Sequence, residues 1–523
     1  MFARVCRLAE CGKAMTPIRP TRMPSTLTQS STPGTAPIAQ SELIQAIARF
    51  AATRSDTVAV AEIGPDGGIA RSRTFGQLAA DAAARAHMLA DATEVGDVVL
   101  AVLPSGIEYA AWFIAAIAAG VIFLPMHAQV AGPEALIVAR RAGAKRAIVA
   151  PGVSAASALA DLALPGLSHL SASDQATGSA RPLHVMRSRA GAIVLGSSGT
   201  TGLPRLALRE NHALEADARS VIAGTALSLE DRVLACTPLS HSYGVDMLLA
   251  TLTVGATLHV LGEFDAAVVA SQLRRGITVL PGVPFIFEAL ARTPSGERHN
   301  LRLALSAGSA LPARVRQDFL NAWGVQIVQL YGATELGTVA IGSSCSTEND
   351  PGCIGRPLAG VSMIVVDPGD HSRRLGPGVE GHLAVAAPSM LSKYLDGEVP
   401  TVDGHLLTGD LASIDSKGRV RITGRLKFLI DIGAYKVNPL EVEGVLNQHP
   451  GVAECVVVPL VLSDTIQRLR VMYVASDPSR IPSSESLRQF LRERLSPNKI
   501  PRVFERADSL PKTPTGKIQR DQF

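Results

Sequence analysis

The sequence has little net charge, few cysteines and few aromatic residues. Its 50 basic and 46 acidic residues leave a net charge of only +4, and the 523 positions contain no long basic run. This balance argues against a nucleic acid or an anionic surface as the partner. The six cysteines show no paired metal-ligand spacing, so reduced thiols are expected. Aromatic residues make up 4% of the chain, a composition bias from which no function follows.

The first 38 residues have little acidic character and no sustained apolar periodicity. They are rich in Pro, Ser, Thr and Arg, with Glu10 as their single acid, and are expected to form a disordered extension. A transit peptide is an alternative, but the segment has neither a sustained amphipathic helix nor a secretory apolar core. A later start, at Met15 or Met23, is another alternative. We therefore expect a cytoplasmic protein.

One uncharged stretch, Tyr109 to Met126, has the length needed to span a membrane. It is rich in Ala and is interrupted by Gly120 and Pro125. This favours a buried helix that ends at Gly120, followed by a strand over Val121 to Leu124. The sequence therefore predicts no membrane span.

The chain is long enough for roughly two to four domains and a large core. From about residue 40, apolar helical stretches alternate with short β-branched runs, at residues 98–102, 146–150, 232–235, 257–261 and 326–330. Such alternation predicts a layered α/β architecture with largely parallel sheets. Beyond residues 424–427 the pattern changes to a helix, two strands and a second helix, at residues 439–448, 455–458, 470–475 and 483–495. This pattern predicts a small α+β domain.

An apolar run, Gly191 to Leu195, is expected to be a buried strand, and it leads into a loop rich in glycine and hydroxyl side chains. Three glycines, four Ser or Thr residues, a proline and Arg205 follow within residues 196–205. Glycine lets backbone N–H groups approach an anion, while the hydroxyls and Arg205 add further donors. The loop is typical of a phosphate site. It is not a Walker loop, because five residues separate Gly196 from Gly202 and Leu203 follows.

Residues 197–205 resemble the Thr/Ser-Ser/Gly-Gly-Thr-Thr-Gly-x-Pro-Lys signature of the adenylate-forming enzymes, the superfamily of acyl-CoA synthetases, amino-acid adenylation domains and luciferases. Four further stretches match in order, over roughly residues 40 to 520. The resemblance implies an α/β fold in which a large N-terminal domain of layered sheets and helices, residues 39–424, binds AMP and the acyl group. It also implies a small, mobile α+β domain at residues 425–523. Arg205 stands where the family usually has a lysine. The charge is kept, but a planar guanidinium group replaces a compact ammonium group, so the donor geometry differs.

The resemblance further implies contacts to ATP and Mg²⁺. In the family's Tyr-Gly-x-Thr-Glu segment, matched by residues 331–335, the ring of Tyr331 stacks on adenine, Thr334 contacts phosphate and Glu335 binds Mg²⁺. A single carboxylate with ATP oxygens and waters is a plausible shell for that ion. Asp410 in Thr-Gly-Asp and Arg425 are the implied ribose contacts. The full set of implied nucleotide contacts is Ser197, Ser198, Gly199, Thr200, Thr201, Gly202, Arg205, Gly308, Ser309, Ala310, Gln329, Tyr331, Gly332, Asp410 and Arg425.

The family's C-terminal lysine is matched by Lys517, in Pro-Lys-Thr-Pro-Thr-Gly-Lys-Ile at residues 511–518. It is expected to reach the substrate carboxylate and the α-phosphate, where a mobile cation neutralises developing charge. The resemblance implies that the catalytic residues are Lys517, His241, Thr334 and Glu335. At the implied hinge, Phe428 replaces the usual Asp or Lys, and Ala434 replaces a glycine beside Gly433 in the implied thiol tunnel. Both departures concern the second half-reaction, in which a thiol attacks the acyl-adenylate.

The segment Pro238 to Gly244 matches the part of the family that lines the acyl pocket. The position that holds a substrate-anchoring Asp in amino-acid adenylation domains falls on Ser242, so no carboxylate is available there for an α-ammonium group. Asp246 would enter the pocket only after a slip of register. An aryl or fatty acid is therefore favoured over an amino acid, with the acyl pocket formed by His241, Ser242, Tyr243, Gly308 and Leu336.

These residues together predict an AMP-forming acid–thiol ligase. A carboxylic acid and MgATP would give acyl-AMP and pyrophosphate, and a thiol would then attack the mixed anhydride. We expect coenzyme A as the thiol, and the phosphopantetheine of a separate acyl carrier protein is the close alternative. A protein that binds ATP or acyl-AMP without turnover is a third reading, suggested by Arg205, Phe428 and Ala434, although Lys517 and Glu335 argue against it. The identity of the acid and the oligomeric state stay open.

Overall fold

Short β-branched runs form strands, as their alternation with helices predicts. The computed structural model describes residues 40–130, 132–153, 168–171, 182–197, 205–293, 298–342, 352–426, 430–432, 435–463, 466–495, 499–513 and 516–523, which belong to a single unit of internal contacts. Three strands have the predicted bounds, namely β3 (Val98–Val102), β9 (Arg232–Ala235) and β10 (Thr257–Leu261). The strands predicted at 146–150 and 326–330 are β5 (Ala144–Val149) and β13 (Ile327–Ala333).

In the described part of the chain, the larger sheet has fourteen strands, in two halves of different character. In one half, β13, β12, β11, β9, β10 and β1 run parallel, because the helices α7 to α10 return the chain between successive strands. The further strands of this half are β1 (Val58–Ile63), β2 (Ile69–Thr74), which pairs antiparallel at the edge, β11 (Val279–Gly282) and β12 (Leu303–Ser306).

In the other half, each strand pairs antiparallel with its neighbours, in the order β14, β15, β21, β20, β17 and β16. The described residues between β13 and residue 438 contain no α-helix that could carry the chain back to the same edge, so consecutive strands reverse direction. The prediction of largely parallel sheets is therefore wrong for this half. Its strands are β14 (Gly337–Ile341), β15 (Cys353–Pro357), β16 (Ser362–Val366), β17 (Gly381–Ala386), β19 (Thr401–Val402), β20 (His405–Ile414) and β21 (Val420–Arg425).

The second sheet has seven strands and contains the hairpin that flanks the glycine-rich loop. In that hairpin, Ser197 at the end of β7 faces Arg205 at the start of β8. The loop residues 198–204 lie outside the described residues. The strands not yet given are β4 (Ile122–Met126), β6 (Ser168–Ser171), β7 (Ala192–Ser197), β8 (Arg205–Glu210) and β18 (Lys393–Tyr394).

The uncharged stretch from Tyr109 to Met126 lies in the buried helix α3 and the strand β4, as predicted. Twelve of the thirteen residues of α3 are buried, which suits a helix that is apolar on every face. The helix ends where Gly120 adopts φ = +71° and its N–H bonds to the carbonyls of Ala116 and Ile117. None of the described helices is long and apolar enough to cross a membrane. The described helices before residue 400 are α1 (Glu42–Thr53), α2 (Phe75–Ala92), α3 (Ile107–Ala119), α4 (Gly132–Ala142), α6 (Asn211–Thr225), α7 (Ser242–Val254), α8 (Ala266–Arg274), α9 (Pro284–Ala291) and α10 (Ala313–Trp323).

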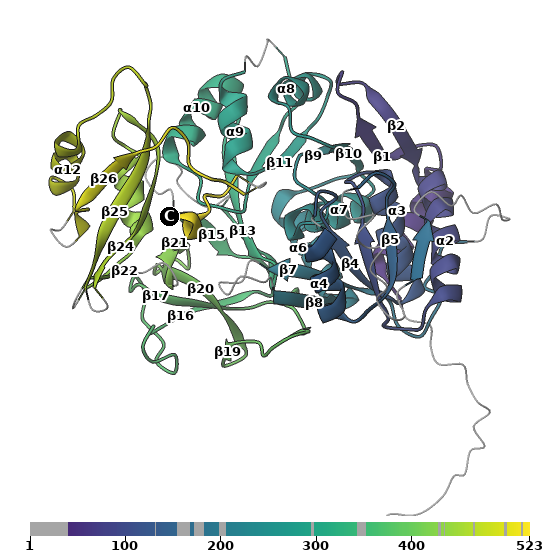
Figure 1. Cartoon of the computed structure of the whole chain (residues 1–523). Coiled ribbons are helices and arrows are strands. Elements are labelled where there is room, and N and C mark those ends of the chain that lie inside the picture. Colours follow the sequence, from purple (N-terminus) through teal and green to yellow (C-terminus); the bar gives the residue numbers. More distant parts are fainter. Residues whose placement is uncertain are drawn as a thin grey trace, which may run out of the picture. The chain divides into compact units, whose positions relative to one another are not determined.

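The C-terminal residues form the α+β arrangement that the sequence predicts (Figure 1). The predicted helices are α11 (Pro439–Leu446) and α12 (Ser484–Arg492), and the predicted strands are longer than expected, as β24 (Val452–Ser463) and β25 (Ile466–Ala475). Asn438 caps α11 by accepting the N–H of Leu440, and its own amide donates to Thr423 O at 2.6 Å. The remaining elements are β22 (Ile430–Ile432), β23 (Tyr435–Val437), β26 (Val503–Arg506) and a 3₁₀ turn, η4 (Arg520–Gln522).

The described cysteines divide into two groups. Cys236 and Cys455 are free thiols, as expected. Cys353, at the start of β15, is disulfide-bonded, so the expectation of reduced thiols is wrong for that residue. Spacing along the chain does not reveal which cysteines meet in the fold.

Candidate active site

Several predicted site residues lie at the carboxyl ends of the parallel strands. β12 leads into the exposed turn of residues 308–310, and Gly308 has φ = +85°, a left-handed conformation that favours glycine. β9 leads to His241, and Tyr331 lies near the end of β13. Ligands of α/β sheets bind at this edge. The fold thus brings three of the predicted motifs to one side of the sheet.

The carboxylate of Asp410 accepts hydrogen bonds from two other predicted site residues. Tyr331 donates its hydroxyl to Oδ2 at 2.5 Å, and Arg425 donates Nε–H to Oδ1 at 2.5 Å. Burial first, and the charge of Asp410 second, raise the pKa of Tyr331 well above its usual value, so the phenol stays a donor. Burial by itself would lower the pKa of Arg425, but Asp410 outweighs it and the pKa is raised. Asp410 is therefore held in place before any ligand binds.

The turn between β13 and β14 carries Thr334 and Glu335. A Cβ atom on Gly332 would lie 2.3 Å from the carbonyl oxygen of Gly337, so only glycine allows the two strands to approach this closely. Gln329, earlier on β13, donates Nε2–H to Cys353 O at 3.1 Å. These contacts fix the spacing between Tyr331 and the turn residues.

Arg205 and Glu335 are joined through Tyr394. The guanidinium carbon of Arg205 lies 3.5 Å from the centroid of the Tyr394 ring, and Arg205 donates to Glu398 O at 2.6 Å. Tyr394 in turn donates its hydroxyl to Glu335 Oε1 at 2.8 Å. Burial first, and Glu335 second, raise the pKa of Tyr394. A lysine could not form this flat stacking contact, so the departure at Arg205 has a structural counterpart.

Glu335 is the carboxylate to consider for Mg²⁺. No group of three or more His, Cys, Asp or Glu side chains that could hold a metal occurs in the described part of the chain. One carboxylate is nevertheless enough for Mg²⁺ that is shared with ATP, because this ion keeps waters and phosphate oxygens in its shell. Tyr394 occupies one oxygen of Glu335, and the carboxylate has a second. The donor set therefore fits.

Lys517 lies near residues more than 200 positions away in the chain. A Cβ atom on Gly308 would be 4.0 Å from Cε of Lys517, and one on Gly516 would be 3.3 Å from Cβ of Phe285. The loop that carries the lysine is closed by Thr513, whose N–H donates to Lys517 O at 2.7 Å and whose Oγ1 accepts the Lys517 N–H at 3.1 Å. Lys517 keeps solvent-exposed surface, but desolvation by the protein around it first, and Arg425 second, lower its pKa, whereas Asp410 opposes them. The charges of Arg425 and Asp410 therefore act on the ammonium group of Lys517.

His241 begins α7 and also lies within the field of Lys517. Its Nδ1 accepts the N–H of Tyr243 at 3.3 Å, which caps the helix. His241 keeps solvent-exposed surface, but desolvation by the protein around it first, and the charge of Lys517 second, lower its pKa to about 4. The ring is therefore neutral near pH 7, and because Nδ1 is an acceptor, the proton resides on Nε2. His241 is a hydrogen-bond donor at this edge rather than a base.

Three other predicted acyl-pocket residues are buried, whereas Gly308 lies in the exposed turn. Ser242 is buried at the start of α7, and Tyr243 donates its hydroxyl to Leu305 O at 3.1 Å. Leu336 is fully buried and packs in a cluster with Val339. Because the hydroxyl of Tyr243 is already bonded to the backbone, the ring is the part of this side chain that is left for contact with a ligand. Leu336 contributes to the core.

Asp246, which a slip of register could have brought into the pocket, is bonded to Arg209. Arg209 is completely buried and donates to Asp246 Oδ1 at 3.1 Å, to Asp217 Oδ2 at 2.5 Å and to Ser389 O at 3.2 Å. Burial first, and Asp217 second, raise the pKa of Asp246 well above its usual value, because one guanidinium serves two carboxylates. Asp246 is thus not a free carboxylate for a substrate ammonium group.

Several predicted site residues lie outside the described residues. They are Ser198, Gly199, Thr200, Thr201 and Gly202 of the glycine-rich loop, Phe428 of the hinge, and Gly433 and Ala434 of the thiol tunnel.

Sequence reasoning missed Tyr394 and the Arg209 cluster. Arg209 directly follows the apolar run Leu206 to Leu208 on β8, and a charge at the end of such a run is a weak signal of a buried pair. Tyr394 has no comparable signal, because its role depends on β18 pairing with β8.

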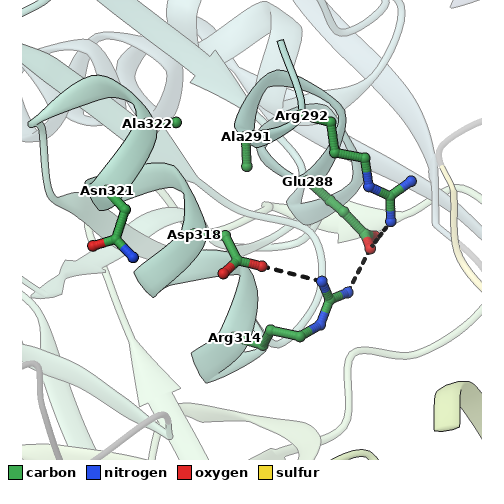
Figure 2. A pocket seen from close by; sticks show the side chains of 7 residues that line it. All are labelled: Glu288, Ala291, Arg292, Arg314, Asp318, Asn321 and Ala322. Carbon is green, nitrogen blue, oxygen red and sulfur yellow. Dashed lines mark hydrogen bonds and ion pairs between the residues drawn. The ribbon is translucent and has the colours of Figure 1, made fainter. Parts of the chain in front are cut away.

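A surface pocket between α9 and α10 does not coincide with these residues (Figure 2). In it, Glu288 pairs with Arg292 and Arg314, and Arg314 also pairs with Asp318. These charges satisfy one another, and none of them belongs to the predicted motifs.

Comparison with known proteins gives a family match over most of the chain. The model of the AMP-binding enzyme family matches residues 47–395, and that of the AMP-binding enzyme C-terminal domain matches residues 441–517. A methyl-dioxo-octahydro-indenyl-propanoyl:CoA ligase of Mycobacterium tuberculosis is 30% identical over 79% of this chain and 86% of its own length. A feruloyl-CoA synthase of an Amycolatopsis species is 31% identical over 63% of this chain and 68% of its own.

A solved structure of similar fold is o-succinylbenzoate CoA synthetase of Bacillus subtilis, in complex with its acyl-adenylate intermediate. It superposes with a TM-score of 0.81, covering 92% of this chain and 98% of its own, at 23% identity. This likeness supports the mixed α/β architecture with a small C-terminal domain.

Proposed function

Because this chain belongs to the family of AMP-binding enzymes and is an AMP-forming acid–CoA ligase by type, we propose that it activates an aryl or fatty acid with ATP and transfers the acyl group to coenzyme A. The observation that carries the proposal is the position of Lys517. A C-terminal loop brings its ammonium group to the same edge of the sheet as Gly308 and His241. Asp410 and Arg425 are close enough there to act on its charge. A substrate carboxylate and the α-phosphate of ATP would meet at that edge.

In the first step, a carboxylate oxygen attacks the α-phosphorus of ATP, and the bond to the bridging oxygen of the β-phosphate breaks. Pyrophosphate leaves, and acyl-AMP remains. Lys517 neutralises charge on the two anions, and the neutral His241 donates its Nε2–H to the substrate carboxylate. Glu335, oriented by Tyr394, would hold the Mg²⁺, which neutralises phosphate charge. The proposed ribose ligand is Asp410, assisted by Arg425.

In the second step, the sulfur of coenzyme A attacks the acyl carbonyl, the carbon–oxygen bond to AMP breaks, and the thiol proton passes to solvent. We assign this step to an arrangement in which residues 425–523 have turned about a hinge at Phe428, with Gly433 and Ala434 beside the thiol. In this proposal the domain boundary stands at residues 424 and 425, and Asn438, which bonds to Thr423, spans it. Residues 1–38 remain a proposed extension.

The preference for an aryl or fatty acid rests on the surroundings of α7. Ser242 offers no carboxylate to an α-ammonium group, and Asp246 is committed to Arg209. Tyr243 offers an aromatic ring whose hydroxyl is already bonded. The names of the relatives, a feruloyl-CoA synthase and a ligase of a bicyclic propanoyl group, agree with a ring-bearing acid.

The test is acid-dependent exchange of labelled pyrophosphate into ATP over aryl, medium-chain and long-chain acids. We expect exchange with at least one of these acids, and then thioester formation on coenzyme A. Exchange with amino acids alone would contradict the substrate class. Loading of an acyl carrier protein, with no thioester on coenzyme A, would replace the proposed acceptor.

A further inference from the structure

The segment Thr408 to Asp410, which carries the proposed ribose ligand, bulges out of the antiparallel pair β17–β20. In the register of this pair, His382 faces Leu411, whereas Ala384 faces Leu407. A single residue of β17, Leu383, therefore spans three residues of β20. Gly409, at the centre of the bulge, has φ = +78°, and no Cβ there would meet a neighbour. Its backbone N–H cannot find its partner in the regular ladder.

The side chain of His382 supplies that partner. The N–H of Gly409 donates to Nε2 of His382 at 2.9 Å, and His382 is buried, with 6% of its surface exposed. The bulge is fixed at its other side by the Thr408 hydroxyl, which donates to Leu383 O at 2.9 Å and accepts the N–H of Asp410 at 3.1 Å. Because Nε2 must accept, the His382 ring can carry its proton only on Nδ1.

A second histidine sets this tautomer. Nδ1 of His382 lies 3.2 Å from Nε2 of His371, and the two rings meet edge to face with centroids 5.1 Å apart. Nε2 of His371 accepts a hydrogen bond from Nδ1–H of His382, which leaves Nε2 of His382 free to accept from Gly409. The groups that act on His382 electrostatically are His371, from the loop before β17, and Asp410, on β20.

We propose that His382, with its tautomer set by His371, is a positioning residue that holds the Thr408–Asp410 bulge so that the Asp410 carboxylate meets the ribose hydroxyls of ATP. The proposal rests on the proposed function, in which Asp410 is the ribose ligand. Protonation of His382 would place an N–H group on Nε2, which could then no longer accept the N–H of Gly409. The loss of this hydrogen bond would open the bulge. Burial first, and His371 second, lower the pKa of His382 to about 4, against the opposing effect of Asp410, which keeps the ring neutral near pH 7.

The experiment compares binding of ATP and of 2′,3′-dideoxy-ATP, each with Mg²⁺, by calorimetry on the full chain. Hydrogen bonds to a charged group stabilise by roughly 1.5 to 3 kcal/mol each, so we expect wild type to prefer ATP by at least about tenfold. Asp410→Ala should remove this preference. His382→Leu should reduce it by about threefold or more, mainly through weaker binding of ATP, and leave the affinity for dideoxy-ATP unchanged. His382→Gln, whose amide oxygen can accept from Gly409, should restore most of it.

If His382→Leu preferred ATP over dideoxy-ATP as strongly as wild type does, the proposed role of His382 would be overturned. An equal loss of affinity for both nucleotides would also overturn it, because it would indicate general damage to the fold. Should His382→Leu not fold, a His382→Gln variant that shows no preference for ATP would overturn the proposal as well. An absence of preference in wild type itself would instead remove the ribose role of Asp410 and, with it, this inference.

His371→Phe supplies an independent readout. It removes both the acceptor of the Nδ1 proton and a group that lowers the pKa of His382. The preference for ATP should therefore be lost at a higher pH in His371→Phe than in wild type. Identical pH profiles in the two proteins would exclude the histidine pair as the positioning device.

Discussion

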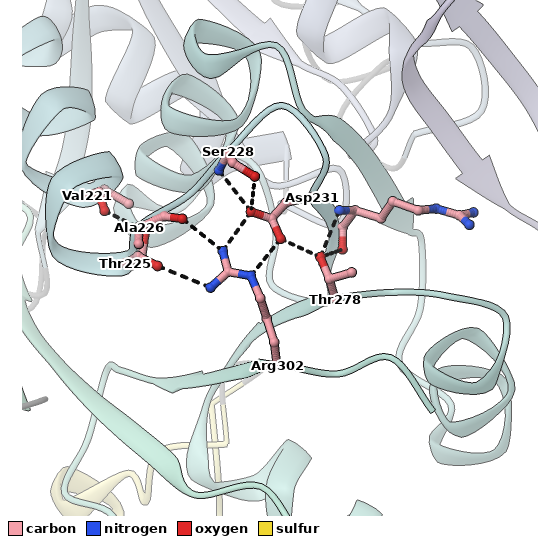
Figure 3. Close-up of polar contacts among 8 residues, drawn as sticks. Val221, Thr225, Ala226, Ser228, Asp231, Thr278 and Arg302 are labelled. Carbon is pink, nitrogen blue, oxygen red and sulfur yellow. Dashed lines mark hydrogen bonds and ion pairs between the residues drawn. The ribbon is translucent and has the colours of Figure 1, made fainter. Parts of the chain in front are cut away.

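The two edges of the parallel strands β9, β11 and β12 are built differently. At their amino ends, Asp231, Thr278 and Arg302 precede the three strands and bond to one another (Figure 3). At their carboxyl ends, the hydroxyls of Thr237 and Ser306 are buried with no hydrogen-bond partner among the described residues. Unpaired buried polar groups are costly, so they tend to mark a place where a ligand or water completes the bonding.

The amino-end network leaves no oxygen of its carboxylate unpaired. Arg302 bonds Asp231 through both oxygens, at 2.8 and 2.6 Å, and Thr278 and the N–H of Ser228 add bonds at 2.7 and 2.8 Å. Arg302 also donates to the carbonyls of Thr225 and Ala226. The comparison indicates that one end of these strands stabilises the fold, whereas the other is left open for chemistry.

The largest effect that would test this division is at Lys517. Lys517→Ala should reduce acid-dependent pyrophosphate exchange by about a thousandfold, the upper range for loss of one preorganised charge-stabilising group. ATP binding and the free energy of unfolding should stay close to wild type, because the ammonium group is at the open edge. Lys512→Ala is the matched control, since Lys512 is in the same loop but pairs with Glu454 at 2.7 Å. Equal losses in both variants would show that the loop, and not the ammonium group, matters.

The converse change is at the amino end. Asp231→Ala should lower the free energy of unfolding by about 2 to 3 kcal/mol, because it leaves Arg302 and Thr278 without their shared acceptor. The rate per folded molecule should not change. Urea unfolding gives the first quantity, and kcat normalised to folded protein gives the second. Asp508→Ala, at a carboxylate that is 91% exposed, should alter stability by less than about 0.5 kcal/mol. A lower kcat in Asp231→Ala with unchanged stability would contradict the division between the edges.

The same carboxylate predicts how stability depends on pH. Burial alone would raise the pKa of Asp231, but Arg302, Ser228 and Thr278 outweigh it and lower the pKa from 3.8 to about 2. A lowered pKa stabilises the folded state above the unfolded value, and the shift corresponds to roughly 2 kcal/mol. This contribution should be complete above about pH 4 and be lost as the pH falls through about 2. In Asp231→Asn the acid-induced loss should be smaller by that amount, and equal losses in the two proteins would refute the assignment.

The sequence could predict whichever parts depend on neighbouring residues. The strands near Val98, Arg232 and Thr257, the end of α3 at Gly120 and the start of α11 at Pro439 follow from local pattern. The bond between Tyr331 and Asp410 joins residues 79 positions apart, and resemblance to a family, not periodicity, identified both. His382 and Tyr394 escaped prediction because each acts on a site residue only through a strand pairing, β17 with β20 and β18 with β8. The antiparallel half of the sheet also escaped prediction, because it too depends on which strands pair.

The smallest effect of this series is at Tyr394, which links Glu335 to Arg205 at the start of β8. Tyr394→Phe keeps the ring beneath Arg205 but removes the hydroxyl that donates to Glu335. A hydrogen bond to a charged group contributes roughly 1.5 to 3 kcal/mol, but this one only orients Glu335, so we expect a part of that, about 1 kcal/mol, and a rise of about fivefold in the Mg²⁺ concentration for half-maximal exchange. Arg205→Lys, which keeps the charge and loses the flat stack, should leave the Mg²⁺ requirement closer to wild type than Tyr394→Phe does. If the requirement rose as much in Arg205→Lys, the stack itself would orient Glu335, and the hydroxyl would be secondary. An unchanged requirement in both would mean that Glu335 is held by its turn alone.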